Sequence, residues 1–412
     1  MTKKEIIKKF TPKLLLRMYH FCLALLGAVI FGFPGKDKNL KIIGVTGTSG
    51  KSTTVDFITR IFEEAGNKVA SQSSIRFKIG EDEWENKYKM TMPGRFVIQK
   101  FLNQAKKAKC KYVVLEVTSE GIRQFRHKFI NFDTAVFTNL TPEHIESHGG
   151  FENYRKEKIK LFRATKNIHV MNIDDENIKY FLETTAKRKL GFGIKSIKNV
   201  SLENGISFEL SGQKFNLNLS GGFNIYNAMA AISVARAYGT SLEVCKKALE
   251  KRPADGGYPG IPGRMEIVAE SPIKVIVDYA HTPAQLEAVY KTFKDKKMVC
   301  VLGSCGGGRD KWKRPVLGEL AAQYCGEIII TNEDPYDESP MDIINQVAQS
   351  AGVKAKKILD REEAIKIAIK SAKQGDVVII TGKGSEPWMC IENGKKIPWD
   401  DRQIARDVVK ST

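Results

Sequence analysis

The sequence lacks the paired cysteines from which disulfide frameworks and structural zinc sites are built. Its 412 residues include seven cysteines, an odd number, and no two of them form a C-x-x-C pair. Neither a disulfide framework nor a zinc site is therefore indicated, and a reducing compartment fits best. The cysteines are Cys22, Cys110, Cys245, Cys300, Cys305, Cys325 and Cys390.

The N-terminal apolar stretch is too short for an ordinary membrane-spanning helix. It runs without a charge from Phe21 to Phe33, whereas a spanning helix needs about 20 residues. No small-x-small cleavage site of a signal peptide is recognised. Residues 1–39 are expected to form a basic, apolar helical segment, and two alternatives stay open: it packs on the next domain or lies on the inner membrane surface. Its basic residues are Lys3, Lys4, Lys8, Lys9, Lys13 and Arg17.

Acidic residues are too few to balance the basic ones, and the formal net charge is +19. This excess suggests polyanionic partners such as nucleic acid, an anionic membrane or nucleotide phosphates. Apart from the tract from Lys106 to Lys111, most basic residues alternate with apolar ones, and no aromatic-rich nucleic-acid module is recognised. Nucleic acid is therefore not expected as a partner.

Alternating strand and helix patterns begin at Leu40 and predict a parallel α/β fold. The glycine- and proline-rich stretch Ala254 to Gly263 cannot sustain an element, so the domain junction is expected just after it. The expected domains are residues 1–39, 40–266 and 267–412. Strands are expected at 40–47, 111–118, 273–280, 296–303, 327–332 and 376–382, and a helix at 51–66.

The segment from Gly44 to Thr54 has the composition of a phosphate-binding loop between a strand and a helix. Its glycines let the backbone close around phosphate, Lys51 offers a charge to the outer phosphates, and Ser52 can ligate magnesium. Glu116 ends a predicted strand, where ligands bind in open α/β sheets. The residues expected to hold the phosphates are Gly47, Thr48, Ser49, Gly50, Lys51, Ser52 and Thr53.

The octapeptide T-G-T-S-G-K-S-T resembles the phosphate loop of the Mur ligases and of the related folylpolyglutamate synthases. The segment Thr138 to Phe162 is similar to the Mur segment around the second metal site. The resemblance implies an ATP-dependent amide-bond ligase that works through an acyl phosphate, with His144 and a carbamylated Lys158 beside Lys51, Ser52 and Glu116. A carbamate suits magnesium, because it is an oxygen anion whereas a lysine ammonium cannot bind a cation.

Three further segments look like Mur ligase signatures: Ser220 to Ala231, Ile261 to Glu266 and Val277 to Pro283. They imply that Asn224, Arg264, Asp278 and His281 approach the nucleotide. The resemblance implies a central P-loop-type ATPase domain with a mainly parallel sheet, followed by a Rossmann-like α/β domain that binds the amino acid.

The likeness is greatest to the branch that adds the third residue of the muramyl peptide. That branch reads its precursor through T-T-P and S-S-x-x-x-x-Q-x-R motifs. The matching residues are Thr91, Met92, Thr118, Gln124 and Arg126. Met92 and Thr118 depart from the usual threonine and serine, so contacts with the precursor are expected to differ in detail.

The C-terminal domain carries the residues that the resemblance implies for the incoming amino acid. They are Arg309, Gly382 and Glu386, together with Glu333, Asp334 and Tyr336. The last three belong to E-D-P-Y, which replaces the D-N-P-R selectivity motif of the diaminopimelate-adding branch. Losing that arginine removes a bidentate carboxylate clamp. The amino acid therefore stays open between diaminopimelate, lysine and another.

The resemblance leaves the carrier of the precursor undecided. Members of this branch begin with a domain that binds uridine diphosphate, and residues 1–39 show no counterpart. The precursor is either held by its muramyl peptide alone or lipid-linked and met at the membrane. A folylpolyglutamate-type ligase and a non-catalytic nucleotide-dependent membrane module are the rival hypotheses. The expected ligands are ATP, magnesium, a muramyl peptide precursor and a free amino acid, and the expected location is the cytoplasm, with or without attachment to the inner membrane face.

Overall fold

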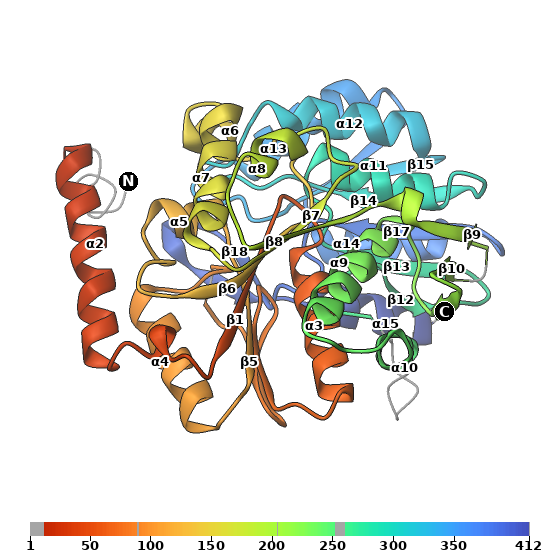
Figure 1. Ribbon diagram of the computed structural model, residues 1–412. Coiled ribbons are helices and arrows are strands. Elements are labelled where there is room, and N and C mark those ends of the chain that lie inside the picture. The colour runs from red at the N-terminus through yellow and green to blue at the C-terminus, as the bar shows by residue number, and fades with distance from the viewer. Residues whose placement is uncertain (1–11, 89, 204, 252–259, 412) are drawn as a thin grey trace. The chain divides into compact units, whose positions relative to one another are not determined.

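The computed structural model describes residues 12–88, 90–203, 205–251 and 260–411 (Figure 1). These form two compact units, which are described separately. The first unit comprises Met1–Pro142, Gly149–Leu217 and Phe223–Lys251. The second comprises Glu143–His148, Asn218–Gly222 and Arg252–Thr412. Lys3, Lys4, Lys8 and Lys9, and most of the stretch expected to form the junction, lie outside the described residues.

An eight-stranded sheet forms the centre of the first unit, in the order β4-β3-β2-β5-β1-β6-β7-β8. Six neighbouring strands from β2 to β8 pair in parallel, and β3 and β4 add an antiparallel edge. The strands are β1 (Lys41–Thr46), β2 (Val69–Gln72), β3 (Arg76–Ile79), β4 (Asp82–Glu85), β5 (Tyr112–Glu116), β6 (Phe132–Phe137), β7 (Ile168–Asn172) and β8 (Arg188–Phe192).

Helices cover both faces of this sheet because its strands are apolar on both sides. One face packs against α3 (Lys51–Glu64) and α9 (Phe223–Ala237), with α10 (Leu242–Glu250) beside them. The core of the other face joins β-strand side chains to α4 (Arg95–Lys107) and α7 (Phe151–Ala164). Short helices α5 (Ser119–Arg123) and α8 (Ile178–Leu182) follow strands β5 and β7.

A small antiparallel sheet completes the first unit. It consists of β9 (Ile197–Ser201), β10 (Ile206–Leu210) and β11 (Gln213–Leu217), in the order β11-β10-β9. The buried rings of Phe208 and Phe215 stack across β10 and β11, 5.1 Å apart.

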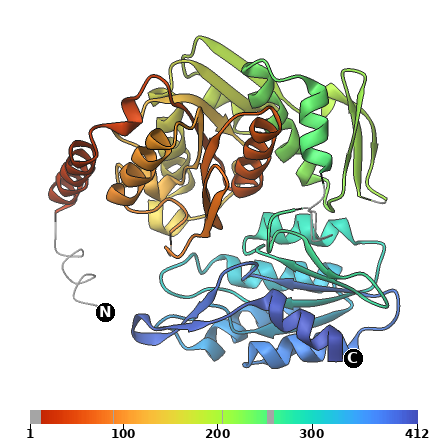
Figure 2. The same ribbon diagram turned by 90° about the horizontal axis from the view of Figure 1, so that it is seen from below.

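A six-stranded sheet forms the centre of the second unit, in the order β12-β13-β17-β14-β15-β16 (Figure 2). Only β12 is antiparallel, at one edge. The strands are β12 (Glu266–Ala269), β13 (Lys274–Asp278), β14 (Met298–Leu302), β15 (Glu327–Thr331), β16 (Ala355–Ile358) and β17 (Val377–Thr381). A hairpin of β18 (Trp388–Cys390) and β19 (Lys396–Pro398) follows.

Helices lie on both faces of this sheet too. The valine and isoleucine side chains of its central strands pack against α14 (Arg361–Ser371) and α15 (Asp401–Ser411). The remaining helices are α6 (Ile145–His148), α11 (Pro283–Thr292), α12 (Lys313–Tyr324) and α13 (Pro340–Ala351). The α/β fold expected from the sequence is confirmed, and each expected strand is present, one to three residues shorter than its expected range.

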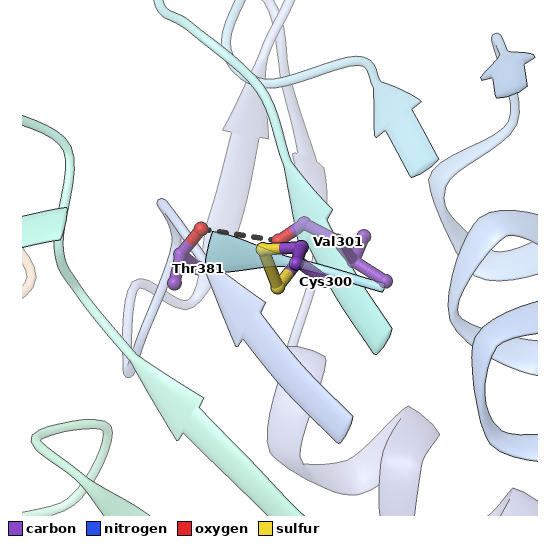
Figure 3. The surroundings of a disulfide bond; sticks show 4 residues. Cys300, Val301 and Thr381 are labelled. Atoms are coloured by element: carbon purple, nitrogen blue, oxygen red, sulfur yellow. Dashed lines mark hydrogen bonds between the residues drawn. A yellow bond between two sulfur atoms is a disulfide. The ribbon is translucent and has the colours of Figure 1, made fainter. Parts of the chain in front are cut away.

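One cysteine pair contradicts the sequence analysis. Cys300 in β14 and Cys325, directly after α12, form a disulfide (Figure 3). The β14–α12–β15 crossover brings together two cysteines that are 25 residues apart, so no local C-x-x-C pattern marks them. The bridge is fully enclosed at Cys300, and Thr381 donates a hydrogen bond to the neighbouring Val301 carbonyl at 3.1 Å.

The basic N-terminal segment forms α2 (Lys13–Ile30), which packs against α4 in the same unit (Figure 1). A 3-10 turn, Pro34–Lys36, then leads to β1. Among the described residues, no helix combines the length and the hydropathy needed to cross a membrane.

Candidate active site

The turn between β1 and α3 is shaped by two glycines. A Cβ on Gly47 would lie 1.9 Å from the hydroxyl oxygen of Thr138. Gly50 has a φ of 78° and directly precedes α3, and a Cβ there would lie 2.2 Å from Oδ1 of Asn227. Side chains are therefore excluded at both positions, and the backbone stays close enough to an incoming anion for its N–H groups to bind it.

Two residues after β6 brace this turn. The Thr138 hydroxyl donates to the Ser49 carbonyl at 2.7 Å, and the Asn139 amide both donates to that carbonyl and accepts from the Ser49 N–H. Sequence reasoning did not single out Thr138 or Asn139. Both directly follow β6, whose pairing with β1 is a long-range contact that no local sequence pattern marks.

Lys51, Ser52 and Glu116 come together at the carboxyl ends of β1 and β5. Glu116 is buried, and its Oε2 accepts a hydrogen bond from the Ser52 hydroxyl at 2.9 Å and one from the Ser74 N–H at 2.8 Å. The Lys51 Nζ lies 3.8 Å from the other carboxylate oxygen. Ser74, which sequence reasoning missed, also contacts the Ser52 hydroxyl at 2.9 Å.

Lys158 projects from α7 onto the same turn. The residue is 2% exposed, and its Nζ donates a hydrogen bond to the Gly47 carbonyl at 2.7 Å. Burial, together with the charge of Lys51, lowers the pKa of Lys158 well below its ordinary value. The amine therefore favours its neutral form, which is the nucleophilic form of a lysine.

The side chains around this turn offer oxygen ligands rather than nitrogen or sulfur. No cluster of three or more His, Cys, Asp or Glu residues in the described ranges could hold a metal. Magnesium instead prefers one or two carboxylates, with water and phosphate oxygens completing its shell. Ser52 and Glu116 fit that preference. Their hydrogen bond brings the two side-chain oxygens within 2.9 Å of each other, close enough to bind the same cation.

Asn224 lies in the first turns of α9 and is buried. Its Oδ1 accepts a hydrogen bond from the amide of Asn227 at 2.9 Å, and Asn227 in turn lies against Gly50. Asn224 is therefore linked through Asn227 to the turn between β1 and α3, which is called the phosphate turn below. Asn227 is the residue that touches the turn, and the sequence analysis did not name it.

The residues expected to bind the precursor lie around the start of α4. The Arg126 guanidinium is buried, donates to the Met92 carbonyl, and contacts the Gln124 amide oxygen at 2.8 Å. Burial, aided by the charge of Arg95, lowers the pKa of Arg126 to about 10. Thr118 serves as the N-cap of α5 by accepting from Gly121 at 3.1 Å, and Thr91 is held through its carbonyl by Gln72.

In the second unit, Arg264, Asp278 and His281 lie around the end of β13. Asp278 accepts hydrogen bonds from the N–H groups of Met265 and Ala280, both at 2.7 Å, and burial raises its pKa. The Arg264 guanidinium lies 4.2 Å from the centroid of the Tyr279 ring. Burial lowers the pKa of His281 well below its ordinary value, and its Nδ1 lies 2.9 Å from the Tyr279 carbonyl.

The segment that carries His144 belongs to the second unit. The Asp310 carboxylate accepts from the N–H groups of Ile145 and Glu146 at 3.0 Å, so it holds the first turn of α6. The buried carboxylate of Glu143 pairs with the buried Lys313 at 3.4 Å. His144 itself has a φ of 56°, an uncommon backbone conformation for a residue with a side chain.

The residues expected for the amino acid gather at the carboxyl ends of β14, β15 and β17. Lys383, fully buried, pairs with Asp334 at 3.0 Å and with Glu386 at 2.6 Å. Its own place in T-G-K-G-S-E was the available signal, yet the sequence analysis passed over it. Tyr336 packs on Gly307, and Arg309, two residues further along the chain, is exposed.

Glu333 is the least satisfied group of this cluster. Its Oε1 accepts from the Cys305 thiol at 3.0 Å, whereas its Oε2 has no hydrogen-bond partner within the described ranges. A Cβ on Gly382 would lie 2.0 Å from Oε2, so glycine there makes room for the carboxylate. Burial raises the pKa of Glu333, and the nearby charge of Arg361 opposes that rise.

The fold and the phosphate turn define a nucleotide-binding enzyme with a second α/β unit rich in buried charged groups. Residues 45–235 match the model of the Mur ligase middle domain, and residues 263–384 match that of the Mur ligase glutamate ligase domain. The chain belongs to the Mur ligase family, and it is an ATP- and magnesium-dependent ligase that forms amide bonds.

Known relatives agree over most of the chain. A UDP-N-acetylmuramoyl-L-alanyl-D-glutamate–2,6-diaminopimelate ligase of Syntrophomonas wolfei is 36% identical over 94% of this chain and 81% of its own length. A solved structure of a ligase with the same name is 29% identical, with a TM-score of 0.61 over 91% of this chain and 79% of that one. A folylpolyglutamate synthase of Mycobacterium tuberculosis has a TM-score of 0.69 over 88% of this chain and 92% of that one, at 15% identity, which shows a shared fold only.

Proposed function

We propose that this ligase adds a free amino acid to a muramyl peptide precursor of peptidoglycan. The names of the two ligases described above state that they act on such a precursor. The observation that carries the proposal is the buried amine of Lys158 on the Gly47 carbonyl, because burial lowers its pKa and so favours the neutral amine that carbamylation needs. The fold shared with folylpolyglutamate synthase, at 15% identity, does not favour a folate acceptor.

The proposed reaction has two steps. An oxygen of the peptide carboxylate attacks the γ-phosphorus of ATP, so that ADP leaves and an acyl phosphate forms. The neutral amine of the amino acid then attacks the acyl carbon, phosphate leaves, and the nitrogen loses a proton. Lys51 and the N–H groups of the turn would bind the phosphoryl oxygens, and Glu116 with Ser52 would hold magnesium, which neutralises charge on those oxygens when bound.

Lys158 has the environment that its proposed carbamate needs. A neutral lysine amine adds to carbon dioxide and releases one proton, which leaves an anionic carbamate. Burial lowers the pKa of this amine and so favours its neutral form. In the carbamate form Lys158 would supply oxygen ligands to magnesium, and His144 is proposed to act with it.

The remaining site residues are proposed in the roles expected from the sequence. Thr91, Met92, Thr118, Gln124 and Arg126 would bind the precursor, and Asn224, Arg264, Asp278 and His281 would approach the nucleotide. The Arg309 guanidinium suits the α-carboxylate of the amino acid. Exclusion of water would protect the acyl phosphate from hydrolysis.

The amino acid is proposed to lack a second carboxylate. Compared with D-N-P-R, the E-D-P-Y sequence replaces a neutral amide by Asp334 and a cation by Tyr336, so the formal net charge of the motif falls by two. Lys383 already satisfies Asp334, whereas Glu333 retains an unpartnered buried oxygen. An amino acid with a cationic side chain, such as lysine, suits this cluster better than the diaminopimelate in the relative's name.

The chain is proposed to work in the cytoplasm, where ATP is available, with peripheral contact to the inner membrane face through residues 1–39. The basic residues of this segment and the apolar helix α2 support the contact. A lipid-linked muramyl peptide is the second candidate acceptor, favoured by the apolar surface that α2 exposes.

A matrix of acceptors and amino acids tests the proposal. Purified chain with ATP and magnesium is given a muramyl dipeptide on a nucleotide, the same dipeptide on a lipid diphosphate, or a folate. Each acceptor is combined with lysine, diaminopimelate or no amino acid. Phosphate release is expected only with a muramyl acceptor and an amino acid together. Release with the folate alone among the acceptors would overturn the proposal.

A further inference from the structure

Helix α2 arranges its side chains by size. Its small residues Ala24, Gly27 and Ala28 are buried against α4, and a Cβ on Gly27 would lie 3.5 Å from the Arg95 carbonyl. Nine of its large apolar residues are 38% to 68% exposed, whereas Leu16 and Leu23 are half-buried. The nine exposed residues are Leu14, Leu15, Met18, Tyr19, Phe21, Leu25, Leu26, Val29 and Ile30.

This arrangement is the reverse of an ordinary surface helix. A helix on a water-soluble core turns its large apolar side chains inward and its polar ones outward. At 3.6 residues per turn, the nine exposed side chains of α2 share about half of the helix circumference. No acidic residue lies in α2. Such a continuous apolar face is the mark of a surface that binds another apolar phase.

The charges that precede this face in the sequence indicate which phase it meets. Residues 1–17 contain six basic side chains and a single acidic one, Glu5. Lysine-rich segments beside an apolar helix are attracted to anionic lipid headgroups. A second protein copy would bring the same positive charge to the interface, because an isologous contact places like patches together. An anionic bilayer therefore matches both the apolar face and its basic flank.

Helix α2 is also joined to the segment that carries the expected precursor-binding residues. The Phe21 ring lies 6.0 Å from that of Phe125 and 5.5 Å from that of Phe129. The Arg95 guanidinium contacts Nδ1 of His20 at 2.5 Å and donates to the Gln124 carbonyl at 3.0 Å. Because Phe125 lies between Gln124 and Arg126, α2 packs directly against the precursor segment, and Arg95 of α4 links His20 to its backbone.

We infer that the exposed face of α2 docks on an anionic lipid bilayer, lying in the plane of its surface, and thereby holds the segment from Gln124 to Phe129 at the lipid boundary. The inference deepens the proposed function, on which it rests for the meaning of that segment. It gives the membrane contact a defined surface and places a muramyl peptide attached to a lipid within reach of Arg126.

Vesicle co-sedimentation of the full chain tests the docking. Vesicles contain either phosphatidylcholine alone or phosphatidylcholine with phosphatidylglycerol. The test variant is Met18→Glu with Leu25→Glu, at the middle of the exposed face. The control is Leu202→Glu with Val353→Glu, two exposed apolar residues far from α2 in sequence. Thermal unfolding and ligase turnover on a soluble precursor are measured for all three proteins, so that folding and chemistry are scored apart from docking.

Binding to the anionic vesicles is expected for the unaltered chain and the control. The partition coefficient of the α2 variant onto the anionic vesicles should be lower by about tenfold or more, because two negative charges oppose insertion of its apolar face. Binding should fall with added salt. Equal sedimentation of the variant, or no binding by the unaltered chain, would overturn the inference. A dimer that the α2 substitutions dissociate, without vesicle binding, would assign the face to a second copy instead.

Discussion

The Nζ of Lys158 donates a 2.7 Å hydrogen bond to the carbonyl oxygen of Gly47, the first glycine of the phosphate turn. A lysine from α7 is thus fixed to the loop that is proposed to receive the triphosphate. The pairing is unusual because no carboxylate forms a salt bridge with the Lys158 amine in the described residues, and Lys51 adds a like charge nearby. Burial thus shifts this amine towards its neutral form beside the phosphate turn.

Replacing Lys158 by alanine is expected to lower turnover by about 100-fold or more, the usual scale for losing a group that stabilises developing charge. Short-chain carboxylates should restore part of the activity by supplying the missing oxygen anion. Initial rates with and without added acetate measure both effects. Lys160→Ala, an exposed lysine on the same helix, is the control and should keep full activity. Unimpaired turnover of Lys158→Ala would remove the carbamate from the mechanism.

The stability of the unmodified protein should depend on the protonation of Lys158. Its folded pKa lies well below 10.5, its ordinary value, so the unfolded chain binds a proton that the folded chain does not. The resulting penalty is complete below the folded pKa and disappears as the pH rises towards 10.5. In carbon dioxide-free buffer, the free energy of unfolding of the unaltered chain should therefore rise with pH relative to Lys158→Met. The assigned pKa shift would be contradicted if the difference in unfolding free energy between the two proteins stayed constant from about pH 7 to about pH 10.

Restoring the lost clamp should change the choice of amino acid. The double substitution Asp334→Asn with Tyr336→Arg restores an arginine guanidinium, which can form two parallel hydrogen bonds with a second carboxylate. The ratio of kcat/KM for diaminopimelate to that for lysine should rise by about 100-fold, the scale of one well-placed ion pair. Asp334→Asn alone is the matched control, because it removes a charge without adding the guanidinium. The charge argument fails if the unaltered chain already prefers diaminopimelate.

Reduction of the Cys300–Cys325 bridge should destabilise the second unit. The bridge spans 25 residues, and opening a loop of that size costs about 3 kcal/mol of unfolding free energy in the chain-entropy account. Thermal unfolding with and without dithiothreitol measures the change. Cys325→Ser should show the lower midpoint in both conditions. If the unfolding midpoint of the unaltered chain is the same with and without dithiothreitol, the prediction is contradicted and the bridge is absent in solution.

Local patterns predicted part of both sheets, namely β1 and β5 of the first and β13, β14, β15 and β17 of the second, because apolar strands and phosphate turns leave signals within a few neighbouring residues. Glu116 was found in this way, as the last residue of a strand. Lys158 was not: on residue type alone it would have been assigned to a solvated surface, and its burial depends on packing between α7 and a turn 111 residues away in sequence. Its role was expected only from the resemblance.

Long-range pairings explain the other omissions. Thr138 and Asn139 brace the phosphate turn across neighbouring parallel strands, and Cys300 meets Cys325 across a crossover. Neither relation has a fixed spacing in sequence. The face that α2 buries was also undetermined, because a helix with large apolar residues on most sides permits several orientations, and the small residues Ala24 and Ala28 decide the one observed.

Transfer of oxygen-18 tests the central claim most directly. The muramyl peptide is labelled in the carboxylate that becomes the amide, and the phosphate released during turnover with lysine is analysed by mass spectrometry. The acyl-phosphate route predicts one labelled oxygen in each phosphate, because the carboxylate oxygen that attacks ATP leaves with the phosphoryl group. Phosphate that is free of label, released in step with amide formation, would contradict the account.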